Sequence, residues 1–248
     1  MGGVIDLHSH ILPGVDDGAR TLAEARELAR SAVADGVEAI AATPHVRADF
    51  PTTPDVMEEG VAELRADFHE EGIPLQVLHG GEIDLDLLWA IPPGELARLT
   101  IAQTGRYLLL EFPYRSWPLA LDSAVSGLVK RGITPLLAHP ERNPEVQERP
   151  ARIEALVEAG ALVQVTGASL DGRLGRASQL TAKRLLELGL VHTLASDAHG
   201  PHIREGGLAA AAEAVGDDTL ARYLTREAPA AIVAGGPVPP VPQVGLGA

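Results

Sequence analysis

The sequence contains no cysteine, which excludes a disulfide scaffold, a thiolate zinc site and a cysteine nucleophile. Basic residues are also scarce, because 20 Lys and Arg stand against 34 Asp and Glu, for a formal net charge of −14. Nucleic-acid backbones are bound through Lys and Arg, so we expect no nucleic-acid partner. No apolar run reaches the roughly 18 residues that a spanning helix needs, and no signal peptide is visible. We therefore expect a cytoplasmic protein without membrane insertion.

What the sequence does contain is an alternation of short apolar runs and helical patterns. The apolar runs lack polar alternation, which is typical of parallel strands buried on both faces. The helical patterns cover approximately residues 21–36, 55–71, 119–131, 149–159 and 178–188, with a short helix or loop at 91–103. Strand and helix alternate about seven times, which predicts a parallel α/β fold with its site at the carboxyl ends of the strands.

The chain shows no internal domain boundary and no sequence repeat. Because α/β barrels of this length form single units, we expect one domain over residues 1–248. Residues 236–248 form a proline-rich tail that we expect either to wrap around the surface or to be disordered.

Six of the seven apolar runs end in residues that bind metal ions, whereas the seventh ends in Thr166. The candidates are His8, His10, His45, Glu82, Glu111, His139, Asp197 and His199. Parallel strands bring their carboxyl ends together, so these side chains predict one multinuclear metal site. Nitrogen and oxygen donors without sulfur favour Mn²⁺, Fe²⁺, Zn²⁺ or Mg²⁺. The candidates outnumber what one or two ions need, so we expect three ions.

Several of these residues, and some of their neighbours, have a second interpretation. A buried Glu111 carboxylate is compensated either by a metal ion or by a salt bridge to Arg142. Arg142 and Arg204 are expected beside the metal site, where an arginine is stable only if it shares an anion, and the guanidinium suits phosphate. Aromatic residues follow two of the strands and either clamp an aromatic substrate or pack in the loops; they are Phe50, Phe112, Tyr114 and Trp117.

These motifs resemble the PHP (polymerase and histidinol phosphatase) superfamily, and within it the capsule-associated tyrosine phosphatases of the CpsB/CapC/YwqE kind. The resemblance is carried by residues 6–13, 15–18, 42–45, 80–82, 110–112, 138–142 and 190–199. It implies a distorted (βα)7 barrel of the TIM type and a trinuclear site that is usually active with Mn²⁺. It also implies phosphotyrosine phosphatase activity toward a bacterial tyrosine kinase of polysaccharide export.

The resemblance also assigns ligands to three ions. The first ion would be held by His8, His10, Glu82 and Asp197, the second by Glu82, Glu111 and His139, and the third by Asp17, His45 and His199. Asp16 is the alternative to Asp17. The family tends to have Gly-x-Arg-x-Pro after the last histidine, whereas this chain has Gly200-Pro201-His202-Ile203-Arg204. The role of Arg204 therefore stays open.

The implied reaction is metal-assisted hydrolysis, in which a metal-activated hydroxide attacks the phosphorus of a monoester. Three functions remain: a protein tyrosine phosphatase, a small-molecule phosphatase of the histidinol phosphatase type, and a non-catalytic metal-binding regulatory module. Exonuclease activity is disfavoured by the negative charge. The expected partner is a phosphotyrosine protein, and a homo-oligomer stays open.

Overall fold

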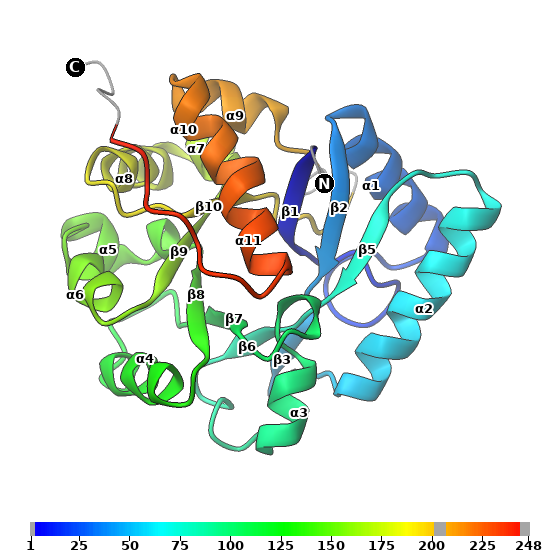
Figure 1. The fold of residues 1–248 in the computed structure, drawn as a ribbon, viewed down its shortest axis with the longest axis horizontal. Coiled ribbons are helices and arrows are strands. Elements are labelled where there is room, and N and C mark those ends of the chain that lie inside the picture. Colours follow the sequence, from blue (N-terminus) through cyan, green and yellow to red (C-terminus); the bar gives the residue numbers. More distant parts are fainter. Residues whose placement is uncertain (1–2, 201–206, 244–248) are drawn as a thin grey trace.

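Parallel strands surrounded by helices form the body of the protein (Figure 1). The computed structural model describes residues 3–200 and 207–243. Its strands are β1 Val4–Ser9, β2 Val37–Ala42, β3 His45–Arg47, β4 Phe50–Pro51, β5 Gln76–His79, β6 Glu82–Asp84, β7 Tyr107–Glu111, β8 Thr134–Ala138, β9 Leu162–Thr166 and β10 Thr193–Ala195. All pair in parallel except β3 with β4, which confirms the predicted parallel fold.

The strands belong to two sheets, ordered β1-β2-β5 and β10-β9-β8-β7-β6-β3-β4. Two strands pass from one sheet to the other. Strand β2 continues as β3 beyond Thr43-Pro44, and β5 continues as β6 beyond Gly80-Gly81. Proline cannot donate to a ladder and glycine weakens one, so both breaks fall where pairing is easily interrupted.

The two broken strands count once each, which gives seven parallel positions in chain order. The last position meets the first, because Ser9 bridges to Ala198 and the His10 amide donates to the Ala198 carbonyl at 2.8 Å. The fold is thus a distorted (βα)7 barrel of the TIM type, as predicted. We call the carboxyl ends of its strands the site end.

The helices are α1 Leu22–Ala34, α2 Pro54–Glu70, α3 Pro93–Arg98, α4 Leu121–Lys130, α5 Pro144–Glu148, α6 Arg152–Glu158, α7 Gly167–Leu170, α8 Arg176–Glu187, α9 Ala209–Val215, α10 Asp218–Arg222 and α11 Ala228–Val233. Thr21 caps α1 by accepting from the Glu24 amide. The helix predicted from residue 119 begins at Leu121, which leaves Leu119 97% exposed. None of the helices within the described ranges is long and apolar enough to cross a membrane.

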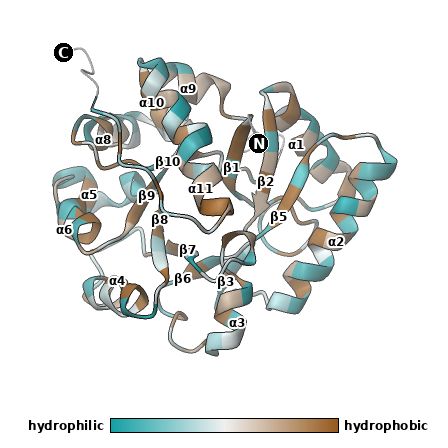
Figure 2. Ribbon diagram, in the orientation of Figure 1, coloured by the Kyte–Doolittle hydropathy of each residue, from teal (hydrophilic) through white to brown (hydrophobic). Residues whose placement is uncertain are grey.

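The barrel has an apolar interior: in Figure 2 most of its strands are largely brown, and the surrounding helices carry teal on their outer faces. Leu109, Leu136 and Ile232 belong to this interior core. At the amino ends of the strands, α11 and the tail as far as residue 243 cover the barrel, and the Tyr107 hydroxyl donates to the Gly236 carbonyl. We call this the tail end. The tail therefore wraps around the surface over its described part.

Candidate metal centre

Four buried side chains at the site end hold metal-binding atoms close to one another. His8 lies in β1 and His10 directly follows it, Glu82 begins β6, and Asp197 follows β10. The two Nε2 atoms are 3.2 Å apart, and each lies 3.4 Å from an oxygen of Glu82 and 3.4 Å from Oδ1 of Asp197. A tetrahedral ion with bonds of about 2.1 Å separates its ligand atoms by roughly 3.4 Å. The separations of these atoms therefore match those between neighbouring ligands of one ion.

The outer nitrogens of the histidines are also held. Nδ1 of His8 lies 3.0 Å from Oε1 of Gln164, and Nδ1 of His10 lies 2.7 Å from Oδ2 of Asp16. Such partners fix the ring orientation and leave the other nitrogen free for a metal. Gln164, in the one apolar run that ends without a ligand, was missed from the sequence. Its signal was an amide at the centre of an otherwise apolar strand.

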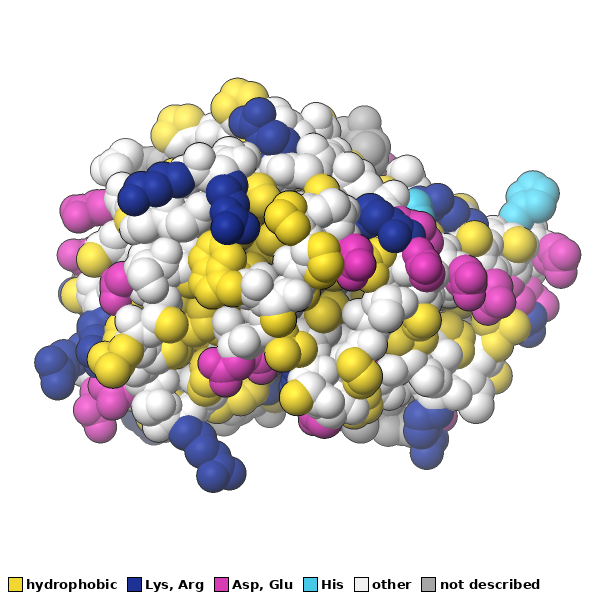
Figure 3. Space-filling model, turned by 90° about the horizontal axis from the view of Figure 1, so that it is seen from below, with side chains coloured by type: hydrophobic (Ala, Val, Ile, Leu, Met, Phe, Trp, Pro, Cys, Tyr) yellow, Lys and Arg dark blue, Asp and Glu magenta, His cyan; other side chains and the backbone are white. Residues whose placement is uncertain are grey.

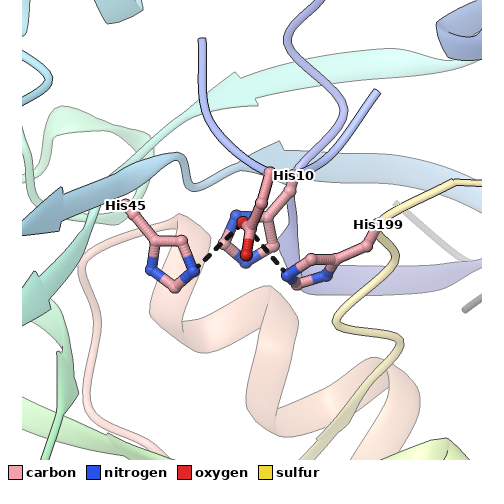
Figure 4. A group of neighbouring side chains, drawn as sticks. His10, His45 and His199 are labelled. Atoms are coloured by element: carbon pink, nitrogen blue, oxygen red, sulfur yellow. Dashed lines mark ion pairs between the residues drawn. The ribbon is translucent and has the colours of Figure 1, made fainter. Parts of the chain in front are cut away.

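Asp16 and Asp17, which the sequence did not distinguish, have different surroundings. Asp16 accepts from the His45 amide at 2.9 Å as well as contacting His10. Asp17 Oδ1 instead lies 3.4 Å from Nε2 of His45 and 3.5 Å from Nε2 of His199. Figure 4 shows the rings of His10, His45 and His199 converging, with these two ion pairs dashed. Asp17 thus occupies a ligand-like position, whereas Asp16 supports two of the histidines.

This short loop is held close to β1 by glycine. A Cβ atom on Gly18 would lie 2.1 Å from the carbonyl oxygen of His10, so no other residue fits there without movement. The loop closes through the Ala19 amide, which donates to that carbonyl at 2.9 Å. His10, Asp17, His45 and His199 can consequently each offer an atom within 4.8 Å of the others.

A third group of donors is formed by His45, Glu82 and Glu111, and it also lies within 4.8 Å. His139 joins it through Nε2, which lies 2.9 Å from Oε1 of Glu82. Burial, followed by repulsion from Glu82, raises the pKa of Glu111 to about 7. Burial, assisted by Arg142, lowers the pKa of His139 to about 4. A neutral imidazole beside crowded carboxylates is the state that a metal ligand requires.

Two of the expected ligands have unusual backbone conformations. His139 has φ 35° and Asp197 has φ 52°, both in the left-handed region that residues other than glycine rarely adopt. His139 lies directly after β8 and Asp197 lies two residues after β10, and both side chains line the site. Such conformations cost of order 1–3 kcal/mol and persist where the surrounding structure holds them, often at functional sites.

Arg142 lies at the metal centre, as predicted, but it does not pair with Glu111. Its Nη1 donates to Oδ2 of Asp197 at 2.8 Å, and its guanidinium lies 4.7 Å from the centroid of the Tyr114 ring. The Tyr114 ring in turn stacks on His139, with centroids 5.5 Å apart. The salt-bridge interpretation of Glu111 is therefore wrong for Arg142. Arg204 and His202 lie outside the described residues.

The four aromatic residues divide into two pairs. Tyr114 and Phe50 lie against expected ligands, since the Phe50 ring stacks on His45 at 6.0 Å. Phe112 and Trp117 instead contact each other edge to face at 6.3 Å and pack against the core. The clamp interpretation is thus restricted to Phe50 and Tyr114, because Phe112 and Trp117 pack within the loop.

Arg47 is a second residue of the site that the sequence analysis missed. It lies in β3, two positions after His45, and two residues apart in a strand face the same side. This spacing was the available signal. Arg47 and Arg142 both line a cavity of about 100 Å³ together with the expected ligands. The combination of buried carboxylates, neutral or hydrogen-bonded histidines and two guanidinium groups suits divalent cations that share an anion.

The chain is similar to known proteins of one family. Residues 4–233 match the family described as capsular polysaccharide synthesis, CpsB/CapC. The tyrosine-protein phosphatase YwqE of Bacillus subtilis is 38% identical over 208 residues, which cover 81% of this chain and 79% of that protein.

Two solved structures resemble this fold, one of them much more closely than the other. A chain from the crystal structures of YwqE from Bacillus subtilis and CpsB from Streptococcus pneumoniae, described as metal-dependent tyrosine phosphatases, superposes with a TM-score of 0.85. It is 33% identical, and the match covers 97% of this chain and 99% of that one. A histidinol phosphate phosphatase of Lactococcus lactis shares the fold alone, at 14% identity and a TM-score of 0.50 over 79% and 86% of the two chains. The chain belongs to the CpsB/CapC family.

Proposed function

We propose that this chain is a Mn²⁺-dependent protein tyrosine phosphatase that removes phosphate from phosphotyrosine. The observation that carries the proposal is the buried cluster of His8, His10, Glu82 and Asp197, in which Asp197 also accepts a hydrogen bond from Arg142. The membership of the CpsB/CapC family supports the same activity, since its relatives include tyrosine-protein phosphatases.

Three ions are proposed, with ligands drawn from the three groups of donors. Glu82 would bridge the first and second ions, because its oxygens face His8, His10, His45 and His139 at 2.8–3.4 Å. Asp17, His45 and His199 would hold the third. When bound, divalent ions supply an activated water and neutralise charge on the phosphoryl oxygens.

The protein's own residues would orient the phosphoryl group. The Arg142 guanidinium donates a hydrogen bond to Asp197, and the Tyr114 ring packs against its face. The guanidinium is therefore already oriented when the substrate binds. An arginine held in this way stabilises charge that develops on the phosphoryl oxygens without reorganisation. Arg204, which the sequence also nominates, remains a proposed second contact.

The small size of the cavity favours a substrate that inserts only a small group and remains mostly outside the cavity. Its volume of about 100 Å³ is small beside the roughly 300–1,000 Å³ of usual small-molecule pockets. A phosphoryl group and part of a phenyl ring would enter, while a polypeptide would remain at the surface. Phe50 and Tyr114 lie against ligand histidines and would contact the ring.

The leaving group also favours tyrosine. A phenol has a pKa near ~10 and leaves readily, whereas an alkoxide needs a proton from a placed acid. The described histidines at the site end pair with carboxylates and are expected to bind metal ions. Because a metal-bound imidazole is a poor proton donor, they would not protonate an alkoxide leaving group. The test is the rate on phosphate monoesters of graded leaving-group pKa, with Mn²⁺. We expect phosphotyrosine peptide to be hydrolysed at least tenfold faster than histidinol phosphate or phosphoserine; equal rates would instead support the small-molecule phosphatase.

The physiological substrate in this proposal is a bacterial tyrosine kinase of capsule or exopolysaccharide synthesis. The family description, capsular polysaccharide synthesis, supports this class of partner. A cytoplasmic location belongs to the same proposal and is compatible with the lack of cysteine. On the face seen in Figure 3, basic and acidic side chains are interspersed, so this face offers no uniform basic field to a nucleic acid. A homo-oligomer stays open.

A further inference from the structure

Arg47 is the second guanidinium of the cavity, and the proposed hydrolysis does not yet use it. Its side chain is 23% exposed and reaches the cavity from β3. Its Nε donates to Oδ1 of Asp49 at 2.7 Å. Its two Nη atoms each lie 3.9 Å from an oxygen of Asp17 or Glu111. Those separations exceed a hydrogen bond, so within the described part of the chain the fork of Arg47 is attracted to carboxylates without bonding to them.

Bound metal ions would weaken the attraction of Arg47 to Asp17 and Glu111. Asp17 and Glu111 are both proposed metal ligands, and a bound cation would neutralise the charge that now attracts Arg47. The guanidinium would then face cations at short range, which is unfavourable unless an anion lies between them. A phosphoryl group carries two negative charges and presents oxygens that fit the planar fork.

The barrel places Arg47 and Arg142 on different sides of this anion. Arg47 belongs to the second strand position and Arg142 follows β8, the fifth of seven, so about half of the ring separates them. The two sides are built alike. Arg47 lies 5.1 Å from the centroid of the Phe50 ring, which stacks on His45. Arg142 lies 4.7 Å from the centroid of Tyr114, which stacks on His139.

We propose that Arg47 is a second phosphate-binding residue, which contacts the phosphoryl group of the substrate from the side of the cavity opposite Arg142. This inference rests on the proposed phosphatase function and identifies how the substrate's anion is held. Phe50 supports the guanidinium on one face, Asp49 holds its Nε, and the two Nη atoms lie toward Asp17 and Glu111, which line the cavity.

The test compares Arg47→Gln and Arg47→Lys with a matched control, Arg131→Gln. Arg131 also lies over an aromatic ring, 4.6 Å from the centroid of Trp89, but it does not line the cavity. The Mn²⁺-loaded proteins are titrated with inorganic phosphate by calorimetry, their metal content is measured, and KM and kcat are determined on a phosphotyrosine peptide. Losing one charge-assisted contact predicts about tenfold weaker phosphate binding and about tenfold higher KM in Arg47→Gln.

We expect metal content to stay unchanged, Arg47→Lys to recover part of the affinity, and Arg131→Gln to match the wild type. Unchanged phosphate affinity in Arg47→Gln would overturn the proposal. Loss of metal from Arg47→Gln would also overturn it, because Arg47 would then only position Asp17 and Glu111. If the wild-type protein hydrolyses no monoester, the proposed function fails, but the phosphate titration still decides whether Arg47 binds the anion.

Discussion

Two buried histidines, one at each end of the barrel, have pKa values that are shifted in opposite directions. Burial lowers the pKa of His45, at the site end, but the nearby carboxylates of Asp17 and Glu82 outweigh this effect and raise the pKa to about 9. His192, which precedes β10 at the tail end, has its pKa lowered to about 4 by burial. The tail end resembles an ordinary core. At the site end, several carboxylates are buried close together, and protonation of a neighbouring histidine such as His45 offsets their negative charge when no metal ion is bound.

The charged site end and the apolar tail end should also differ in their contributions to activity and to stability. At the site end, Glu82 and Glu111 are buried close together, and burial, followed by repulsion from Glu82, raises the pKa of Glu111. Such an arrangement costs stability that bound cations restore. At the tail end, Ile232 is fully buried, and the tail lies over the interior core. Changes at the site end should therefore alter metal and activity, and changes at the tail end should alter folding.

The largest effect is expected from Glu82→Ala. Because Glu82 faces four histidines, its loss should remove two ions together and lower kcat/KM by about 10³-fold or more. Metal content by plasma mass spectrometry and the rate on a phosphotyrosine peptide would check this, with the exposed Glu63→Ala as control. Loss of one ion alone would remove the bridging role. Full activity of the wild type after long incubation in excess chelator would contradict the metal site itself.

Arg142→Ala should have a smaller effect that leaves the ions in place. Removing one charge-stabilising donor predicts a fall in kcat/KM of about 10²-fold with unchanged metal content. Arg152→Ala is the matched control, since Arg152 lies 4.5 Å from the centroid of Trp117 and does not line the cavity. A near-normal rate for Arg142→Ala would show that the guanidinium only neutralises Asp197.

Much of the site end was visible in the sequence because strand periodicity and strand ends are local features. His8 and His10 face one side for this reason, and parallel strands bring distant ends together without any knowledge of packing. The period of two could also have identified Arg47 from His45. The fold was predictable on the same basis, since the apolar runs alternate with helical patterns.

Other features depend on tertiary contacts that no local pattern encodes. Gln164 was missed because its role depends on His8, which is 156 residues away in the chain. Asp16 and Asp17 are adjacent residues of the same type. Which carboxylate faces the candidate ligands depends on the conformation of the loop that Gly18 holds close to β1. Trp117 was equally ambiguous, because strand order places it near the site end while packing against Phe112 turns it into the core.

The tail end offers the converse test. Ile232→Val removes one buried methyl group and should lower the free energy of unfolding by about 1 kcal/mol, with a typical range of 0.5–1.5 kcal/mol. Metal content and kcat/KM should stay within twofold of the wild type. Denaturant unfolding of the metal-free protein checks the first expectation. A variant that loses activity while keeping its stability would show that the two ends are coupled.

The smallest effect concerns His192 and the pH dependence of stability. Its pKa is about 4 in the folded protein against 6.5 when unfolded, so folding favours the neutral ring. The contribution is therefore complete above pH 6.5 and is lost as the pH falls toward 4. Between pH 7 and pH 6 the wild type should lose roughly 0.7 kcal/mol through this group.

His192→Gln isolates that contribution, because glutamine keeps an acceptor for the Val163 amide, which now donates to Nδ1 of His192 at 3.2 Å. The variant should be less stable than the wild type at pH 7, and the difference should shrink by roughly 0.7 kcal/mol at pH 6. Denaturant unfolding of the metal-free proteins at both pH values measures it, since site-end histidines titrate equally in both. A difference that stays constant with pH would mean that the ring is solvated in the folded protein, and the contrast between the two ends would then lie in the carboxylates alone.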